Sequence, residues 1–227
     1  MFNTTILFLS FVACYSSGAD AWNPSSYPFI PACTDTSKVR QLVIEVQGAN
    51  KKILDVGCGD GYSTSSYPGC LGIDTNGASI KRAMKTFPNK SFKLDFLPNI
   101  NEKYDVVTSM FHLHNIPRYT RKKLIKSASE LAIERVVIVD ICPEYQANSD
   151  FFHNKPFTRS YFETCREDLT GFIESPLVKG LLHIWILDKN NTDKQIPTIL
   201  NDSKVLPVVN WRGDGAKLDD QEDTDNF

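Results

Sequence analysis

Short apolar runs alternate with amphipathic stretches along most of the 227-residue chain. Apolar runs of about four to eight residues are typical of strands buried in a parallel sheet, and apolar residues at every third or fourth position are typical of helices. The pattern predicts strands at 53–56, 71–74, 91–95, 104–109 and 136–140, and helices at 37–46, 78–86, 119–132 and 158–169. Such alternation indicates one doubly wound α/β domain with a mostly parallel sheet.

The pattern changes at both ends of this region. Residues 173–178 and 181–187 are separated by Lys179-Gly180 and predict a C-terminal antiparallel hairpin. We therefore place the domain at 37–188, after a proline-containing arm at 22–36. Residues 189–227 form a polar tail in which six of the last fourteen residues are acidic, so we expect this tail to be disordered.

Three alternating glycines directly follow the first predicted strand. Gly57, Gly59 and Gly61 remove every side chain from one side of what looks like a strand-to-helix turn, which lets a ligand approach the backbone. A dinucleotide motif, G-x-G-x-x-G, would place its last glycine at Tyr62, which is too bulky. The spacing here is D-x-G-x-G-x-G, beginning at Asp55.

This motif resembles the first motif of the class I S-adenosylmethionine-dependent methyltransferases. The resemblance continues to Asp74, which ends the second strand, and to Asp95-Phe96 after the third, and it covers roughly residues 37–188. It implies a seven-stranded, Rossmann-like sheet closed by an antiparallel pair, with S-adenosylmethionine as the cofactor.

The resemblance also implies roles for individual residues. Asp55 would orient the glycine loop and the amino end of the cofactor, Asp74 would accept the two ribose hydroxyls, and Asp95 and Phe96 would flank the adenine. Cys58 occupies a position that the family often fills with cysteine, and we interpret it as a small packing residue of the cofactor loop.

The methyl group of a sulfonium is already activated, so the protein mainly has to align the reactants. His112 and His114 follow the fourth strand on the crevice side and are the candidate general bases, with His114 preferred. Alignment alone, or a carboxylate such as Asp140 or Glu144, is the alternative. Residues 140–145 match no N-P-P-Y-type signature, which makes a small molecule the expected methyl acceptor.

Charge and composition exclude several other classes. A formal net charge of −2, four histidines and 23% charged residues favour neither a nucleic-acid partner nor a metal site. The basic side chains of 119–132 lie opposite an apolar stripe, as on a solvated helix face. An odd number of scattered cysteines after residue 21 is unlike a disulfide framework, and nothing in the sequence indicates an oligomeric state.

Residues 1–21 have two of the three parts of a secretory signal peptide. An apolar run at 6–14, too short to span a bilayer, precedes the cleavage-like pattern Ala19-Asp20-Ala21. We therefore expect a secreted or lumenal protein with no membrane span after cleavage. The first five residues contain no lysine or arginine, so a cytoplasmic protein with an amino-terminal extension is the alternative.

Two other functions remain open on the sequence alone. One is a pseudoenzyme that keeps the cofactor loop but lacks a working acceptor site. The other is a secreted interaction protein that uses the integrin-type tripeptide Arg212-Gly213-Asp214 in the tail.

Overall fold

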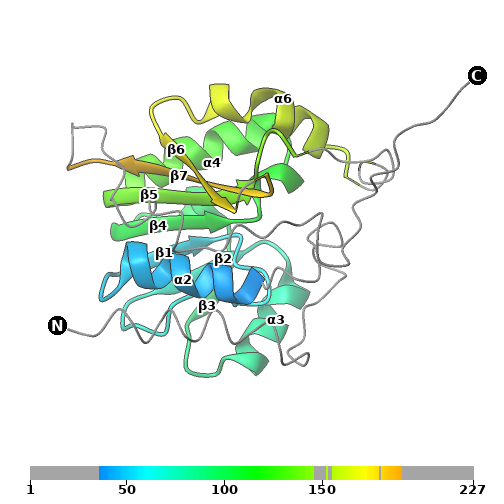
Figure 1. Ribbon diagram of the computed structural model, residues 1–227. Coiled ribbons are helices and arrows are strands. Elements are labelled where there is room, and N and C mark those ends of the chain that lie inside the picture. Colours follow the sequence, from blue (N-terminus) through cyan, green and yellow to red (C-terminus); the bar gives the residue numbers. More distant parts are fainter. Residues whose placement is uncertain (1–35, 146–151, 153–154, 179, 191–227) are drawn as a thin grey trace, which may run out of the picture.

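A seven-stranded sheet in the order β3-β2-β1-β4-β5-β7-β6 forms the centre of the described chain (Figure 1). The computed structural model describes residues 36–145, 152, 155–178 and 180–190. Strand β7 runs antiparallel to β5 and β6, and the other neighbouring strands are parallel. The predicted fold class is thereby confirmed, including the antiparallel pair that closes the sheet.

The elements lie close to their expected positions. The strands are β1 (Ile53–Val56), β2 (Leu71–Asp74), β3 (Phe92–Leu94), β4 (Tyr104–Met110), β5 (Ala132–Ile141), β6 (Ile173–Val178) and β7 (Leu182–Asp188). The helices are α2 (Thr36–Gly48), α3 (Gly77–Thr86), α4 (Arg118–Leu131) and α6 (Thr158–Asp168), with short 3-10 turns η2 (Leu97–Asn99) and η3 (Leu113–Asn115).

Strand β5 begins four residues earlier than the apolar pattern predicts. It starts at Ala132, directly after α4, because Ala132 pairs with Tyr104 and Arg135 pairs with both Val106 and Asp188. The charged pair Glu134-Arg135 looks unlike a buried strand in sequence. Ladder hydrogen bonds to two neighbouring strands, not side-chain burial, therefore set this boundary.

The turn after the glycine loop does not lead directly into a helix, although the glycines look like a strand-to-helix turn in the sequence. Within the described residues, the connection from β1 to β2 consists of turns and bends over 57–70. Ser65, Ser66 and Pro68 disfavour a helix here, since serine side chains compete for backbone groups and proline lacks an N–H. The loop therefore does not present a helix amino terminus to a ligand.

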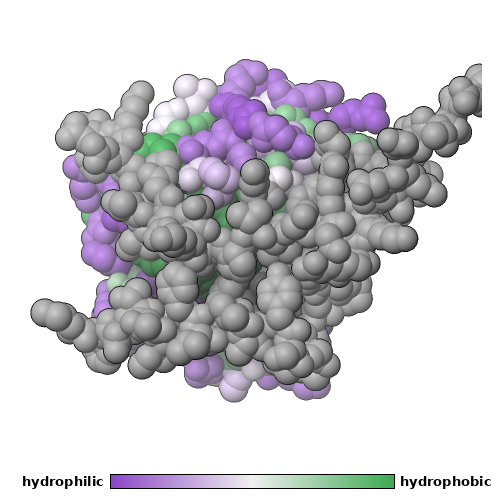
Figure 2. Space-filling model, viewed as in Figure 1, coloured by the Kyte–Doolittle hydropathy of each residue, from purple (hydrophilic) through white to green (hydrophobic). Residues whose placement is uncertain are grey.

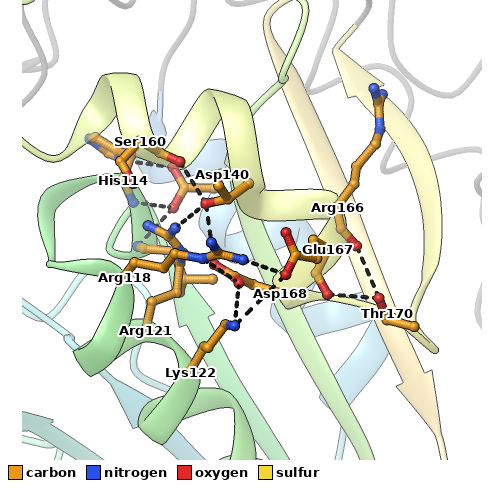
Figure 3. Close-up of polar contacts among 12 residues, drawn as sticks. His114, Arg118, Arg121, Lys122, Asp140, Ser160, Arg166, Glu167, Asp168 and Thr170 are labelled. Carbon is orange, nitrogen blue, oxygen red and sulfur yellow. Dashed lines mark hydrogen bonds and ion pairs between the residues drawn. The ribbon is translucent and has the colours of Figure 1, made fainter.

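Helices cover the two faces of the sheet. Helix α2 crosses in front of the strands and α4 lies behind them (Figure 1). The outer surface near α4 and α6 is mainly hydrophilic where the described residues are visible (Figure 2). Beneath it, α4 and α6 are joined by a fully buried ion pair between Arg121 Nε and Asp168 Oδ2 at 2.8 Å (Figure 3).

Several predictions concern segments outside the described residues. These are the signal peptide at 1–21, the arm up to residue 35, the tail from 191 and the Arg212-Gly213-Asp214 tripeptide. Their structure stays a matter of sequence-based expectation. Among the residues that are described, no helix is both long and apolar enough to cross a membrane.

Candidate functional site

The three glycines of the loop after β1 have different neighbours. All three have positive φ angles, of 72° at Gly57, 54° at Gly59 and 88° at Gly61. A Cβ atom at Gly57 would lie 2.5 Å from the ring of His112, and one at Gly61 would lie 2.6 Å from the ring of Phe92. A Cβ atom at Gly59 would meet nothing within 4 Å. Packing therefore requires two of the glycines, and Gly59 is where a ligand can approach the backbone.

Asp74 lies beside this open position, at the end of the neighbouring strand β2. Its Oδ2 accepts a hydrogen bond from the Gly59 amide at 2.9 Å, and its Oδ1 accepts one from the Asn76 amide at 2.8 Å. Asn76, not Asp74, caps α3 by accepting from the amides of Ala78 and Ser79. The carboxylate is thus held at the glycine loop, and its contact with the ribose hydroxyls stays a prediction.

Asp95 and Phe96 follow β3 in the next loop along the same edge. The Asp95 amide donates to the Asp74 carbonyl at 3.1 Å, which joins the two loops. A hydrogen bond from Lys93, with smaller contributions from Asn99 and the Phe96 amide, lowers the pKa of the Asp95 carboxyl to about 2. The Phe96 ring is 49% exposed, so an aromatic surface is available there. The adenine-flanking role of both residues stays a prediction.

Asp55 is buried beneath the loop and is 1% exposed. Its carboxylate accepts hydrogen bonds from Ser63 at 2.8 Å, Thr64 at 2.7 Å and Thr108 at 3.2 Å. Burial raises the pKa of this carboxyl, and the three hydroxyls and the nearby Arg40 guanidinium act in the opposite direction. Asp55 therefore ties the end of the loop to β1 and β4, while its predicted contact with the cofactor stays untested.

Sequence reasoning missed the groups that hold Asp55 in place. The hydroxyls of Ser63 and Thr64 come eight and nine residues after it, a spacing that fits no regular element. Arg40 lies on the buried face of α2 and donates to Ser63 Oγ at 3.2 Å and to the Met110 carbonyl at 3.3 Å. A charged residue on an apolar helix face was the only signal that could have pointed to them.

Cys58 is 2% exposed and packs in a small cluster with Ile80, Ala83 and Phe92. Burial, together with the carboxylates of Asp55 and Asp74, raises the pKa of its thiol well above the ordinary range. A thiol held neutral in this way is a poor nucleophile. The geometry agrees with the interpretation of Cys58 as a packing residue, and the four cysteines of the described segments are all free.

The chain turns sharply at the end of β4. Phe111 has a φ angle of 58°, an uncommon value for a residue with a bulky side chain, and it is held by burial and by the Arg40 guanidinium 4.5 Å from its ring centre. This turn places the His112 ring against Gly57. Burial lowers the pKa of His112, which keeps its imidazole neutral near pH 7.

His114 points elsewhere, into the protein. Its side chain is fully buried, and Nδ1 lies 2.5 Å from Asp140 Oδ1 (Figure 3). Asp140 Oδ2 also accepts from the Leu113 amide, and Oδ1 from the Ile141 amide, both at 2.8 Å. The two histidines therefore have different neighbours, and His114, the preferred general base, is the more enclosed of the two. A general base at His114 stays a prediction, and His112 lies nearer to the glycine loop.

Comparison with known proteins gives two kinds of match. Residues 54–132 match the family model of a methyltransferase domain. A stretch of 110 residues is 38% identical to the provisionally named methyltransferase 235L of Invertebrate iridescent virus 6, covering 45% of this chain. The chain spans 37% of the length of that viral relative.

Solved structures resemble the fold over about four fifths of this chain. Magnesium protoporphyrin IX methyltransferase from Synechocystis PCC 6803 with bound S-adenosylmethionine superposes with a TM-score of 0.52 over 81% of this chain and 90% of its own, at 16% identity. The same enzyme with bound S-adenosylhomocysteine gives 0.52 over 82% and 94%, at 17% identity. At such identities the likeness shows the fold alone.

The glycine loop, the strand order and the family match agree with one another and with the resemblance read from the sequence. Residues 54–132 match the methyltransferase-domain family, and the described residues adopt the fold of a solved methyltransferase.

Proposed function

We propose that this protein transfers a methyl group from S-adenosylmethionine to a small-molecule acceptor. The observation that carries the proposal is the pairing of an open backbone position at Gly59 with the Asp74 carboxylate 2.9 Å from its amide. A loop without side chains beside a carboxylate at the carboxyl edge of parallel strands fits a ligand that carries adjacent hydroxyls.

The residues present fit this cofactor. Asp74 would accept the ribose hydroxyls, and the backbone near Gly59 would lie against the rest of the molecule. Asp95 and Phe96 offer a charged group and an exposed ring at the next strand end, where adenine would bind. When bound, the cofactor supplies an activated methyl group, and the protein supplies alignment and the exclusion of water.

A neutral imidazole, that of His112, is available beside the glycine loop to remove a proton from the methyl acceptor. His112 is neutral near pH 7 and lies against Gly57, next to the cofactor loop. It can take a proton from a hydroxyl or amine of the acceptor if that group binds within hydrogen-bond distance. The His114–Asp140 pair behind it fixes the backbone after β4, because Asp140 also accepts from the amides of residues 113 and 114.

A small-molecule acceptor is supported by what surrounds the site. The formal net charge of −2 does not favour a polyanion, and the absence of an N-P-P-Y-type signature from residues 140–145 does not favour an amino group on a macromolecule. The Synechocystis enzyme of the same fold is named for a small-molecule substrate, magnesium protoporphyrin IX. A pseudoenzyme would keep the loop and lose turnover, so binding and transfer must be measured separately.

Replacing Asp74 by alanine tests the proposal directly. We expect isothermal titration calorimetry to show S-adenosylmethionine binding weakened by about 2–3 kcal/mol, since two hydroxyls lose a charged partner. Asp105→Ala is the matched control, because Asp105 also accepts a backbone amide, that of Lys52, but at the opposite edge of the sheet. Unchanged affinity in Asp74→Ala contradicts the cofactor site.

Transfer of labelled methyl into fractionated small molecules and into protein fractions then separates the remaining possibilities. Label in a small-molecule fraction is the expected result. Label in protein alone overturns the acceptor class, and binding without any transfer indicates the pseudoenzyme. No cofactor binding at all would favour the interaction protein.

A further inference from the structure

We propose a second site, a transition-metal site of the zinc type, formed by Cys142, Glu144 and His183. One ligand atom from each of these side chains lies within 4.8 Å of the others. No sequence motif predicts it, because His183 belongs to a different strand, far along the chain from the other two residues. The site is separate from the glycine loop, and nothing in it depends on the proposed methyl transfer.

The sheet brings the three residues together. Asp140 is paired with His183 across β5 and β7, and Cys142 follows two residues later, at the carboxyl end of β5. Directly opposed residues of neighbouring strands point to the same face, and so do residues two apart in an extended chain. The sulfur and the imidazole therefore reach the same point next to the sheet edge, where Glu144 enters from the following turn.

The imidazole is already oriented as a metal ligand would be. His183 Nδ1 lies 2.6 Å from Glu174 Oε1 of β6, which leaves Nε2 as the ring atom that can bind a metal. A carboxylate on the outer nitrogen is the usual support of a zinc-bound histidine, because it fixes both the tautomer and the ring. The ring is also packed against Trp185, with 5.7 Å between centroids. Side chains held in this way lose little freedom on binding an ion.

The charges around the site also favour a cation. Glu144 and Glu174 are two carboxylates, and the guanidinium of Arg166 is paired with both of them. Figure 3 shows Arg166 extending away from the ion pairs around Asp168. One guanidinium does not neutralise two carboxylates, so a divalent ion that binds Glu144 adds positive charge where negative charge is in excess. The guanidinium and the ion compete for the same carboxylate.

The ligand types define the class of ion. Thiolate, imidazole and carboxylate together suit Zn²⁺ and its spectroscopic substitute Co²⁺, whereas Mg²⁺ and Ca²⁺ prefer oxygen ligands only. The ligand atoms lie within 4.8 Å of one another, an upper limit longer than their separation around a bound zinc, and Glu144, with a 56% exposed side chain, is the ligand with most room to adjust. Three protein ligands leave one coordination position for water or another small ligand.

Cobalt binding to the purified full chain tests the proposal. We expect one Co²⁺ per chain and a thiolate-to-cobalt charge-transfer band that Zn²⁺ removes by displacement. Cys142→Ser should abolish the band, and His183→Gln should weaken binding by more than the roughly 10–100-fold expected for Glu174→Gln, the outer partner. Cys70→Ser, at a buried thiol in the first half of the sheet, is the matched control and should keep the band.

Arg166→Gln should change the affinity for Co²⁺ in the opposite direction, which distinguishes ligand loss from general damage to the fold. Because it frees Glu144, Co²⁺ should bind about two- to fivefold more tightly, whereas general damage to the fold would weaken binding. Circular dichroism melts without metal establish that each variant is folded, and S-adenosylmethionine affinity should be unchanged in Cys142→Ser. A band that persists in Cys142→Ser, or equal affinities in wild type and Cys142→Ser, overturns the proposal.

Discussion

The two halves of the sheet edge are built in opposite ways. After β1 the backbone is open at Gly59, and the half-buried Asp74 carboxylate at the end of β2 is held beside it by two amides. At the ends of β4 and β5 the polar groups turn inward, and both His114 and Asp140 are fully buried. At the glycine loop, the absence of a side chain leaves room for a ligand. At the ends of β4 and β5, a buried pair of histidine and aspartate stabilises the backbone instead.

The comparison implies that the same type of residue has a different importance in each half. Asp74 should contribute mainly to ligand affinity and little to folding. Asp140 should contribute mainly to folding, because it holds three backbone amides, of residues 113, 114 and 141, together with one imidazole.

Asp140→Ala should have the largest effect on stability. Removing one partner of a buried pair leaves the other uncompensated, so we expect the free energy of unfolding to fall by about 3–5 kcal/mol in urea denaturation. Asp74→Ala, measured in the same way, should lose far less. Comparable losses in the two variants would break the contrast between the halves.

His114→Ala separates a structural role from the predicted catalytic one. If His114 is the general base, kcat falls about 10²–10⁴-fold in the protein that remains folded, while its cofactor affinity stays the same. If it only supports the turn after β4, the unfolding free energy falls and the loss of activity follows it. His112→Ala, in which the ring against Gly57 is removed, provides the comparison.

Gly59→Val and Gly61→Val should differ in what they damage. Valine at Gly59 strains a backbone with a φ angle of 54° but meets no neighbouring atom, so the protein should still be folded by circular dichroism while cofactor affinity falls at least about 100-fold, or ~2.7 kcal/mol. Valine at Gly61 meets the Phe92 ring and should mainly lower the melting temperature. Similar melting temperatures and similar affinities for the two variants would contradict the assignment of Gly59 as the point of ligand approach.

The smallest expected effect concerns pH. Because burial lowers the pKa of His112, the unfolded chain binds a proton at a higher pH than the folded chain does. Stability contributed by the neutral ring is fully present above about pH 6.5 and is lost as the pH falls toward the folded-state pKa. His112→Gln should therefore lose less stability than wild type between pH 7 and pH 5 in urea denaturation. Parallel pH profiles would show that the ring is not protected from protonation.

The residues around the glycine loop are easier to identify from the sequence than the cluster of Cys142 and His183, for a physical reason. The glycine loop, Asp74 and the strand ends lie close together in sequence, and apolar runs followed by glycines or acids identify them. No helix directly follows Gly61, because serine and proline side chains in 62–70 disfavour one. His183 meets Cys142 only through the register of β5 and β7, and no local pattern encodes a register between distant strands.

The connection between β1 and β2, which contains no helix, affects how far the chain can be shortened without losing the fold. Residues 57–70 contain no helix, and α2 helps to stabilise this loop. Arg40 of α2 donates hydrogen bonds to Ser63 in the loop and to the backbone carbonyl at the end of β4. Val39 and Val43 of the same helix belong to the main core. The stretch that matches the methyltransferase family, 54–132, is thus shorter than the unit that folds. A shortened version of this protein for expression or fusion should therefore keep both α2 and β7, that is, residues 36–188.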